Sequence, residues 1–206
     1  MPNRCASYPH TWKRLFEFFA ALFGIIIISP LLLVVALIVK VGSAGPIIYH
    51  QQRIGRSFHP FMIYKFRTMR PGSDADGNTC TVKGDARITP IGRLLRKTKL
   101  DELPQLFNVL IGDMSLVGPR PEVAQYVEMF KEDYKTVLSV RPGITDYAAI
   151  EYRNEEAILA RYSNPQEAYA KEILPAKIAL YKKYIAEQSF LTDLRIILRT
   201  LGKLVN

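Results

Sequence analysis

The longest apolar stretch of the chain covers residues 18–39, which read FFAALFGIIIISPLLLVVALIV and carry no charged side chain. A helix needs about 20 such residues to cross the hydrocarbon core of a bilayer. Ser29 and Pro30 stand near the middle of the stretch, and a proline inside a helix removes a backbone hydrogen bond and bends the helix axis. The pattern therefore predicts a membrane helix with a kink at Ser29 and Pro30.

Basic residues flank this stretch on both sides. They are Arg4, Lys13 and Arg14 before it, and Lys40, Arg53, Arg56, Lys65, Arg67 and Arg70 after it. Because basic flanks stay on the cytoplasmic side of a membrane, a re-entrant helix that enters and returns to the same face fits the pattern. A simple kinked span stays open, since spanning helices tolerate proline. A signal peptide is a third alternative, although its apolar core usually has about 7–15 residues.

Shorter patterns after the apolar stretch predict an α/β domain that is mostly helical, with few short strands. Strands are expected at residues 46–49 and 61–66, on either side of a basic turn at residues 51–60. Helices are expected at residues 90–97, with Thr89 as a candidate N-cap ahead of Pro90, and at residues 103–110 and 122–137. Residues 151–184 are expected to be largely helical, with interruptions at Asn164-Pro165 and near Pro175, and residues 141–145 are expected to form a rigid turn. Residues 71–81 are expected to form a solvated loop, because their acidic positions do not match a complete calcium loop.

The C-terminal segment, residues 190–205, has the spacing of an amphipathic helix. One face carries Phe190, Leu194, Ile197, Leu198, Leu201 and Leu204, and another carries Arg195, Arg199 and Lys203. Such a helix can lie in the interface of a membrane. It can equally close the core of a domain, because the same periodicity serves either purpose.

The chain has 206 residues and a formal net charge of +9, so we expect an anionic partner. Nucleic acid, anionic lipid and phosphorylated substrates all meet this condition, but no recognition helix or base-stacking motif favours nucleic acid. Cys5 and Cys80 lie far apart and form no CxxC pair, which argues against a disulfide framework or a zinc site. No P-loop and no GxGxxG motif is present, which excludes the common nucleotide-binding motifs.

Two adjacent carboxylates, Asp101 and Glu102, precede an apolar helical pattern. In one interpretation Asp101 caps the helix, because a helix start offers free N–H groups and a favourable dipole. In the other, the carboxylates hold Mg²⁺ or attack phosphorus while nearby arginines bind phosphate oxygens. Cations such as Arg96 crowd the approach, and Arg120 is held between two prolines. The residues alone leave both interpretations open.

Several longer motifs follow one another in the order of a known family. They are Ser29-Pro30 in the apolar stretch, Tyr64-Lys65-Phe66-Arg67-Thr68-Met69, Leu100-Asp101-Glu102-Leu103-Pro104-Gln105, Gly112-Asp113-Met114-Ser115, Val117-Gly118-Pro119-Arg120-Pro121 and Arg141-Pro142-Gly143-Ile144-Thr145. Through them the chain resembles the small monotopic phosphoglycosyl transferases of the bacterial sugar transferase family. The resemblance runs almost from end to end.

The resemblance implies a transferase for substituted phosphate groups. It would move a phospho-sugar from a UDP-sugar to polyprenyl (undecaprenyl) phosphate and release UMP, as the first membrane step of a bacterial surface glycan pathway. Asp101 would attack the sugar-linked phosphate and form a covalent phosphosugar intermediate, with Mg²⁺ at Asp101 and Glu102. The substrate-binding residues implied are Lys65, Arg67, Arg96, Arg120 and Arg141.

The resemblance also implies a re-entrant membrane helix within residues 1–41 and a cytoplasmic, membrane-associated catalytic domain over residues 42–206, with interfacial amphipathic helices. The protein would lie at the cytoplasmic face of the bacterial inner membrane and contact its lipids. It would not bind nucleic acid. A homo-oligomer stays open. So do a single-displacement mechanism, in which the carboxylates only bind metal, and a catalytically silent scaffold.

The chain departs from the common family pattern directly after Thr145. Asp146-Tyr147-Ala148-Ala149-Ile150 stands where Gly-Leu and, later, Gln are frequent. This departure leaves the identity of the sugar, and the details of nucleotide binding, undetermined.

Overall fold

The computed structural model describes residues 10–73 and 81–205. Helices dominate this part of the chain, and its strands form two sheets of two strands each, so the predicted mostly helical fold with few short strands is confirmed. The helices are α1 (His10–Gly42), α2 (Pro90–Thr98), α3 (Gln105–Ile111), α4 (Ala124–Met129), α5 (Lys131–Val137), α6 (Tyr147–Glu151), α7 (Glu155–Leu159), α8 (Pro165–Ala168), α9 (Leu174–Glu187) and α10 (Phe190–Val205). The strands are β1 (Ile48–Ile54), β2 (Pro60–Phe66), β3 (Ser115–Val117) and β4 (Gly143–Thr145). Most of the predicted loop at residues 71–81 lies outside the described residues.

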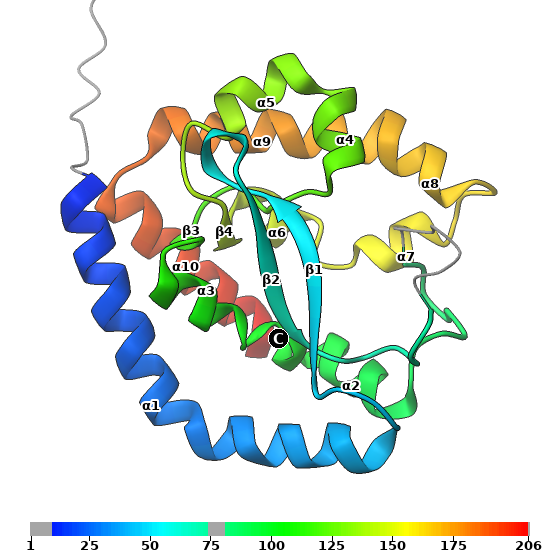
Figure 1. Ribbon diagram of the computed structural model, residues 1–206. Helices are drawn as coiled ribbons and strands as arrows, with labels where there is room; N and C mark the ends of the chain where they lie inside the picture. Colours follow the sequence, from blue (N-terminus) through cyan, green and yellow to red (C-terminus); the bar gives the residue numbers. More distant parts are fainter. Residues whose placement is uncertain (1–9, 74–80, 206) are drawn as a thin grey trace, which may run out of the picture.

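Helix α1 contains the whole predicted apolar stretch and is long and apolar enough to anchor the protein in a membrane. Its ribbon changes direction part-way along and wraps around two sides of the domain (Figure 1). Pro30 lies inside the helix, and the Ser29 hydroxyl donates a hydrogen bond of 2.8 Å to the carbonyl of Ile26. Many apolar side chains of α1 are exposed, among them Phe19, Phe23, Ile26, Ile27, Leu33 and Leu37. This surface is suited to lipid.

The opposite side of α1 belongs to the core of the domain. Ala21 is fully buried with Ile63, Val109 and Met114. Further along, Val35 and Val39 are buried in a second cluster together with Phe66 and Leu95. The anchor helix is therefore packed against the hairpin, α2 and α3.

Strands β1 and β2 form an antiparallel hairpin, seen at the centre of Figure 1. The predicted strand at residues 61–66 is confirmed, but the predicted turn at residues 51–60 is too long. Gln51, Gln52 and Arg53 continue β1 because they pair with Ile63, Met62 and Phe61 across the hairpin. The turn itself is confined to residues 55–59.

Strands β3 and β4 are short and parallel, with Ser115 opposite Gly143 and Val117 opposite Thr145. The prediction of a turn at residues 141–145 is thus wrong for its second half, which is a strand. The segments at Gly118 and Arg141 approach each other very closely, since a Cβ added to Gly118 would lie 2.5 Å from the Arg141 carbonyl oxygen. No side chain larger than glycine fits there, and the crossing sets the path of the segment that carries Arg120.

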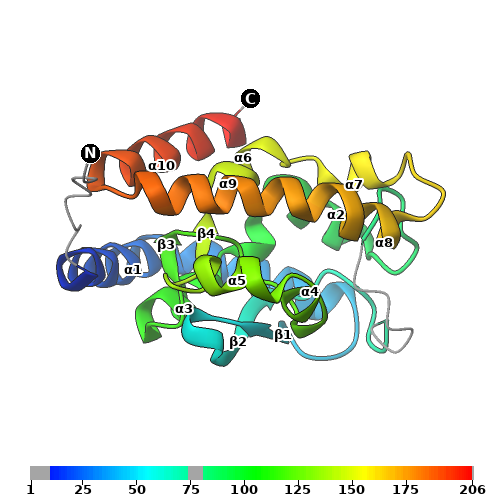
Figure 2. The same cartoon turned by 90° about the horizontal axis from the view of Figure 1, so that it is seen from above.

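Behind this crossing, α4 to α9 enclose a core rich in tyrosine, with Tyr134 and Tyr181 fully buried. The predicted helix at residues 122–137 is divided in two at Phe130, whose φ of −117° is not helical. Within residues 151–184 the predicted interruption at Asn164 and Pro165 is confirmed, because Asn164 caps α8 there, whereas the chain stays helical past Pro175 as α8 continues through a π-helical turn, residues 169–173, into α9. Figure 2 shows α9 and α10 as one layer and α1 below them.

Helix α10 confirms the predicted C-terminal helix. Its buried positions include Thr192, Asp193 and Ile196. The predicted apolar face stays largely exposed, with exposed fractions from 42% at Leu194 to 59% at Leu198, while Ile197 is half-buried. Because that face does not close the core, it is free to lie in a membrane interface.

Candidate active site

Asp101 lies in a single 3₁₀ turn, Leu100–Glu102, between α2 and α3. Lys99 precedes it in the left-handed conformation with φ 59°, which turns the chain sharply after α2. The interpretation of Asp101 as a helix cap is wrong, because Pro104 is the residue at the N-cap of α3 and no side chain caps either helical segment. Asp101 is 6% exposed, and its Oδ1 atom has no hydrogen-bond partner among the described residues.

Glu102 is held by two cations. Both terminal nitrogens of Arg120 donate to its carboxylate, one to Oε2 at 3.1 Å and the other to Oε1. Lys65 of β2 donates to Oε1 at 3.2 Å. Arg120 and Lys65 oppose the effect of burial and hold the pKa of Glu102 well below its usual range. Glu102 is therefore ionised and fixed.

The pKa values of the two neighbouring carboxyl groups, Asp101 and Glu102, are shifted in opposite directions. Burial raises the pKa of Asp101 to about 6, and the negative charge of Glu102 adds to the effect. Lys65, Arg96 and Lys99 act in the opposite direction. Two adjacent carboxyl groups with different environments often have different chemical roles.

Arg96 approaches Asp101 from α2. Thr89 caps this helix through a hydrogen bond from the Gly92 N–H, which confirms the predicted cap and fixes the helix start. The Arg96 side chain donates from Nε to the Thr68 hydroxyl at 2.9 Å and from a terminal nitrogen to Glu156 at 2.7 Å. Glu156, from α7, lies 60 residues from Arg96 in the chain, so no local sequence signal links the two.

The structure brings Lys65, Arg96 and Arg120 to the carboxylate pair, but it places two predicted binding residues elsewhere. The side chain of Arg67 is buried and donates to the carbonyls of Ser43, Pro46 and Val39 at the end of α1. It therefore closes the C-terminus of the anchor helix. Arg141 donates from Nε to the Gly112 carbonyl at 3.0 Å, at the far end of α3.

Asp146 and Gln105 complete the surroundings. Asp146 is 1% exposed and accepts hydrogen bonds from the Arg120 N–H at 3.0 Å and the Ala149 N–H at 2.6 Å. It fixes the segment that carries Arg120 and starts α6.

Gln105 is fully buried one helical turn after Asp101, and neither atom of its amide has a partner among the described residues. Its place in the Asp-Glu-Leu-Pro-Gln motif was the only signal for it in the sequence.

The family model described as bacterial sugar transferase matches residues 8–206. The chain belongs to the bacterial sugar transferase family. It is 38% identical to the exopolysaccharide production protein PSS of Rhizobium leguminosarum bv. phaseoli over 195 residues, which are 91% of this chain and 92% of that protein. It is also 38% identical to the uncharacterized sugar transferase EpsL of Bacillus subtilis, covering 94% of this chain and 87% of the relative.

Longer sugar transferases match as well. The UDP-glucose:undecaprenyl-phosphate glucose-1-phosphate transferase of Klebsiella pneumoniae is 38% identical over 93% of this chain, which spans 40% of that relative. The chain spans 33% of a relative from Aeromonas hydrophila, a UDP-N-acetylgalactosamine-undecaprenyl-phosphate N-acetylgalactosaminephosphotransferase, at 43% identity.

A Gln105→Met substitution tests whether this sugar transferase uses the buried amide for function. Methionine has a similar shape and removes two buried polar atoms whose missing partners cost about 1–3 kcal/mol. We expect an unchanged or higher melting temperature and a transfer rate lowered roughly 100-fold, as for the loss of one polar contact to a reacting group.

Asn108→Leu is the matched control, because Asn108 is equally buried but satisfied by the Tyr64 N–H at 3.0 Å and the Met62 carbonyl at 2.7 Å. It should lower the melting temperature. A Gln105→Met enzyme with full turnover, or one destabilised as much as Asn108→Leu, would show that Gln105 only fills space.

The pH dependence of stability should contain a contribution from Asp146. Burial raises its pKa to about 6, so the folded transferase holds this proton more tightly than the unfolded chain does. The resulting stabilisation is present below pH 4 and is lost as the pH rises through 6, by about 3 kcal/mol. Urea unfolding in detergent should therefore show that the free energy of unfolding declines less between pH 4 and 7 for Asp146→Asn than for the parent. Equal slopes would contradict the expectation.

Proposed function

We propose that this sugar transferase moves a phospho-sugar from a UDP-sugar to polyprenyl phosphate and releases UMP. The observation that carries the proposal is Asp101, a buried carboxylate with an unpartnered oxygen, next to a cluster of cations. The relatives from Klebsiella and Aeromonas, whose names describe transfer to undecaprenyl phosphate, support the same class of reaction.

The reaction would proceed in two displacements at phosphorus. In the first, an Asp101 oxygen forms a bond to the sugar-linked phosphorus, the phosphoanhydride bond breaks, and UMP leaves with the bonding electrons. In the second, an oxygen of polyprenyl phosphate attacks the same phosphorus and the acyl-phosphate bond breaks. The Asp101 carboxylate is thereby restored, and the product is a polyprenyl diphosphate sugar.

The neighbouring side chains have separate tasks in this scheme. Arg120 and Lys65, fixed by Glu102 at 3.1 and 3.2 Å, would bind oxygens of the diphosphate and stabilise the charge that develops on it. Arg96 of α2, fixed by Thr68 and Glu156, would also bind oxygens of the diphosphate. Glu102 is then a positioning residue for the two cations.

The donor set also fits a magnesium ion. Mg²⁺ keeps several waters and needs only one or two protein carboxylates when substrate phosphates complete its shell. The unpartnered oxygen of Asp101 suits this role better than Glu102, whose two oxygens are both engaged by Arg120. When bound, Mg²⁺ would neutralise charge on the diphosphate.

The membrane arrangement that we propose follows from α1. A re-entrant helix kinked at Ser29 and Pro30, within residues 1–41, would keep both of its ends at the cytoplasmic face of the inner membrane. The catalytic part, residues 42–206, would then rest on that face. The exposed apolar side of α10 would contact the headgroup region.

A UMP-release assay over a panel of UDP-sugars tests the proposal. We expect turnover only when polyprenyl phosphate and Mg²⁺ are both supplied, and one equivalent of UMP per enzyme when the lipid is omitted. UMP release that strictly requires the lipid would instead support a single displacement. No release with any UDP-sugar would support the scaffold alternative.

A further inference from the structure

A second group of cations lies at the far end of α3. Arg14 donates to the carbonyls of Val109 and Leu110, the latter at 2.8 Å, and Arg141 donates to the carbonyl of Gly112. Arg56 of the hairpin turn lines a hollow together with Arg141. Arg14, Arg56 and Arg141, which we call the arginine cluster, thus converge from α1, the hairpin and the β4 segment.

The arginine cluster has a large excess of positive charge. The side chain of Arg56 is exposed and makes no hydrogen bond or ion pair within the described part of the chain. The terminal nitrogens of Arg141 likewise have no partner there, and burial together with Arg14 and Arg56 lowers the pKa of Arg141. An unneutralised group of arginines is typical of a phosphate-binding surface.

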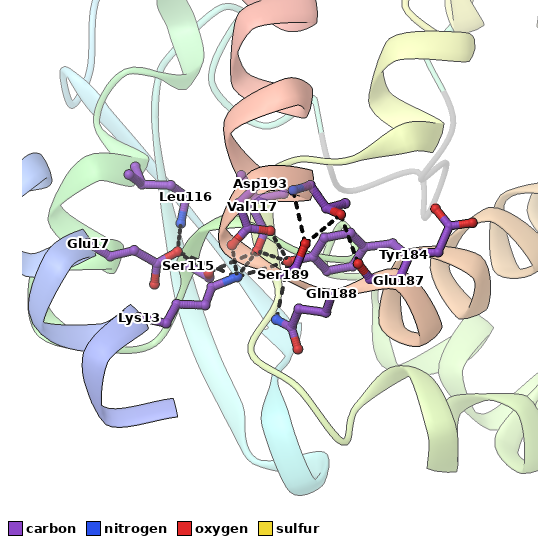
Figure 3. Close-up of polar contacts among 11 residues, drawn as sticks. Lys13, Glu17, Ser115, Leu116, Val117, Tyr184, Glu187, Gln188, Ser189 and Asp193 are labelled. Atoms are coloured by element: carbon purple, nitrogen blue, oxygen red, sulfur yellow. Dashed lines mark hydrogen bonds and ion pairs between the residues drawn. The ribbon is translucent and has the colours of Figure 1, made fainter. Parts of the chain in front are cut away.

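One carboxylate at the hollow, Glu17, acts on Arg141 but offsets only part of the charge of three arginines. Glu17, which lines the same hollow, is 3% exposed and accepts hydrogen bonds from the Ser115 hydroxyl and from the Leu116 N–H at 3.0 Å. It also lies 3.8 Å from Lys13, within the buried network of Figure 3 that ties α1 to β3 and α10. In that network the Lys13 charge is matched by Asp193 at 2.8 Å.

Exposed aromatic side chains lie near the arginine cluster along the chain. Trp12 is 68% exposed and Phe16 is 51% exposed on the same helix as Arg14, and aromatic residues favour the membrane interface. Phe58, 39% exposed, lies two residues from Arg56 at the tip of the hairpin. Exposed aromatic side chains thus flank the half-buried Arg14 and the exposed Arg56, a combination found in surfaces that contact anionic lipid.

The site is separate from the reaction centre. Asp101 precedes α3 and Gly112 follows it, so the seven residues of this helix separate them by roughly 10 Å at the helical rise of about 1.5 Å per residue. A phosphate in the arginine cluster is therefore out of reach of Asp101. This excludes the reacting phosphate of the acceptor lipid as its occupant.

We propose that the arginine cluster binds the phosphate of an anionic phospholipid in the bilayer and fixes the base of α1 and the hairpin tip at the membrane surface. The proposal requires that α1 is seated in the membrane, but it does not depend on the transfer reaction. It predicts a preference for anionic over zwitterionic lipid beside Arg14.

Trp12 provides the probe, because it is the only tryptophan of the chain and lies two residues from Arg14. We would reconstitute the full chain in phosphatidylcholine vesicles with a small fraction of brominated phosphatidylglycerol or, separately, brominated phosphatidylcholine. Bromine quenches tryptophan fluorescence at short range. We expect stronger quenching by the anionic lipid, which reports its enrichment over phosphatidylcholine beside Trp12. This enrichment should fall about fivefold in Arg56→Gln, which corresponds to about 1 kcal/mol for one arginine.

Arg161→Gln is the matched control, because Arg161 is exposed and lies in the segment between α7 and α8, on the opposite side of the molecule from the start of α1 in Figure 1. It should leave the enrichment unchanged. Equal quenching by the two brominated lipids, or an equal loss in Arg161→Gln, would overturn the proposal. So would displacement of the brominated lipid by one equivalent of polyprenyl phosphate or by millimolar inorganic phosphate.

Discussion

Asp101→Asn is expected to abolish sugar-phosphate transfer, with a loss on the order of 10⁴-fold or more, as for removal of a nucleophile. Asparagine keeps the shape of the side chain but cannot form the acyl phosphate. The folded protein should not suffer, because the raised pKa of Asp101 means that its ionised form is disfavoured by burial. Loss of function without loss of stability would separate a chemical role from a structural one.

Mass spectrometry provides the direct measurement for this variant. The parent enzyme mixed with UDP-sugar and no lipid should gain the mass of one phosphosugar on Asp101, and Asp101→Asn should gain none. Asp133→Asn serves as the control, because Asp133 forms a half-exposed surface pair with Lys182 at 2.6 Å. An Asp101→Asn enzyme that turns over normally, together with an unmodified parent, would disprove the covalent mechanism.

Arg120→Met should have the second largest effect, because it harms both activity and stability. Its loss leaves Glu102 buried beside Lys65 alone, and removal of one partner from a buried ion pair costs about 3–5 kcal/mol. We expect about 3 kcal/mol, since the Arg120 side chain keeps 27% exposure and solvent weakens the interaction. Transfer should fall at least 100-fold with the loss of a phosphate-binding donor.

A double-mutant cycle with Glu102→Gln separates the two effects. The neutral glutamine removes the unpaired charge, so Glu102→Gln/Arg120→Met should recover much of the free energy of unfolding in urea but none of the transfer rate. Additive losses of stability would show that Glu102 and Arg120 do not interact as the geometry indicates. Lys135→Met, which breaks an exposed pair with Glu132, should change neither quantity by much.

Local sequence features were sufficient where an element depends on its own residues. The uncharged stretch at residues 18–39 predicted the anchor helix, and Thr89 before Pro90 predicted the start of α2. The spacing of the last residues predicted α10 but could not show which face is buried. That face depends on Thr192, Asp193 and Ile196, which pack against the rest of the domain.

Distant contacts explain where the predicted turns were too long and why the sequence did not distinguish the cations of the motifs. Gln51 to Arg53 became strand because β2 pairs with them, and residues 143–145 became strand because β3 lies beside them. Arg67, Arg96 and Arg141 could not be told apart in the sequence, since each is a cation in a family motif. Their partners, at the end of α1, in α7 and at the end of α3, gave them different roles.

The sequence by itself determined that the protein has a long apolar helix, a mostly helical domain and an Asp-Glu pair within the ordered motifs of a sugar transferase. These features are written in composition, periodicity and short motifs, which need no distant contact. Only the tertiary structure decided that Asp101 keeps an oxygen without a hydrogen-bond partner among the described residues, while Glu102 is paired with Arg120 and Lys65. It also decided that a separate arginine cluster lies at the other end of α3. Both outcomes depend on charges brought together from distant segments by packing, and the effect of burial on a charge is set by those neighbours.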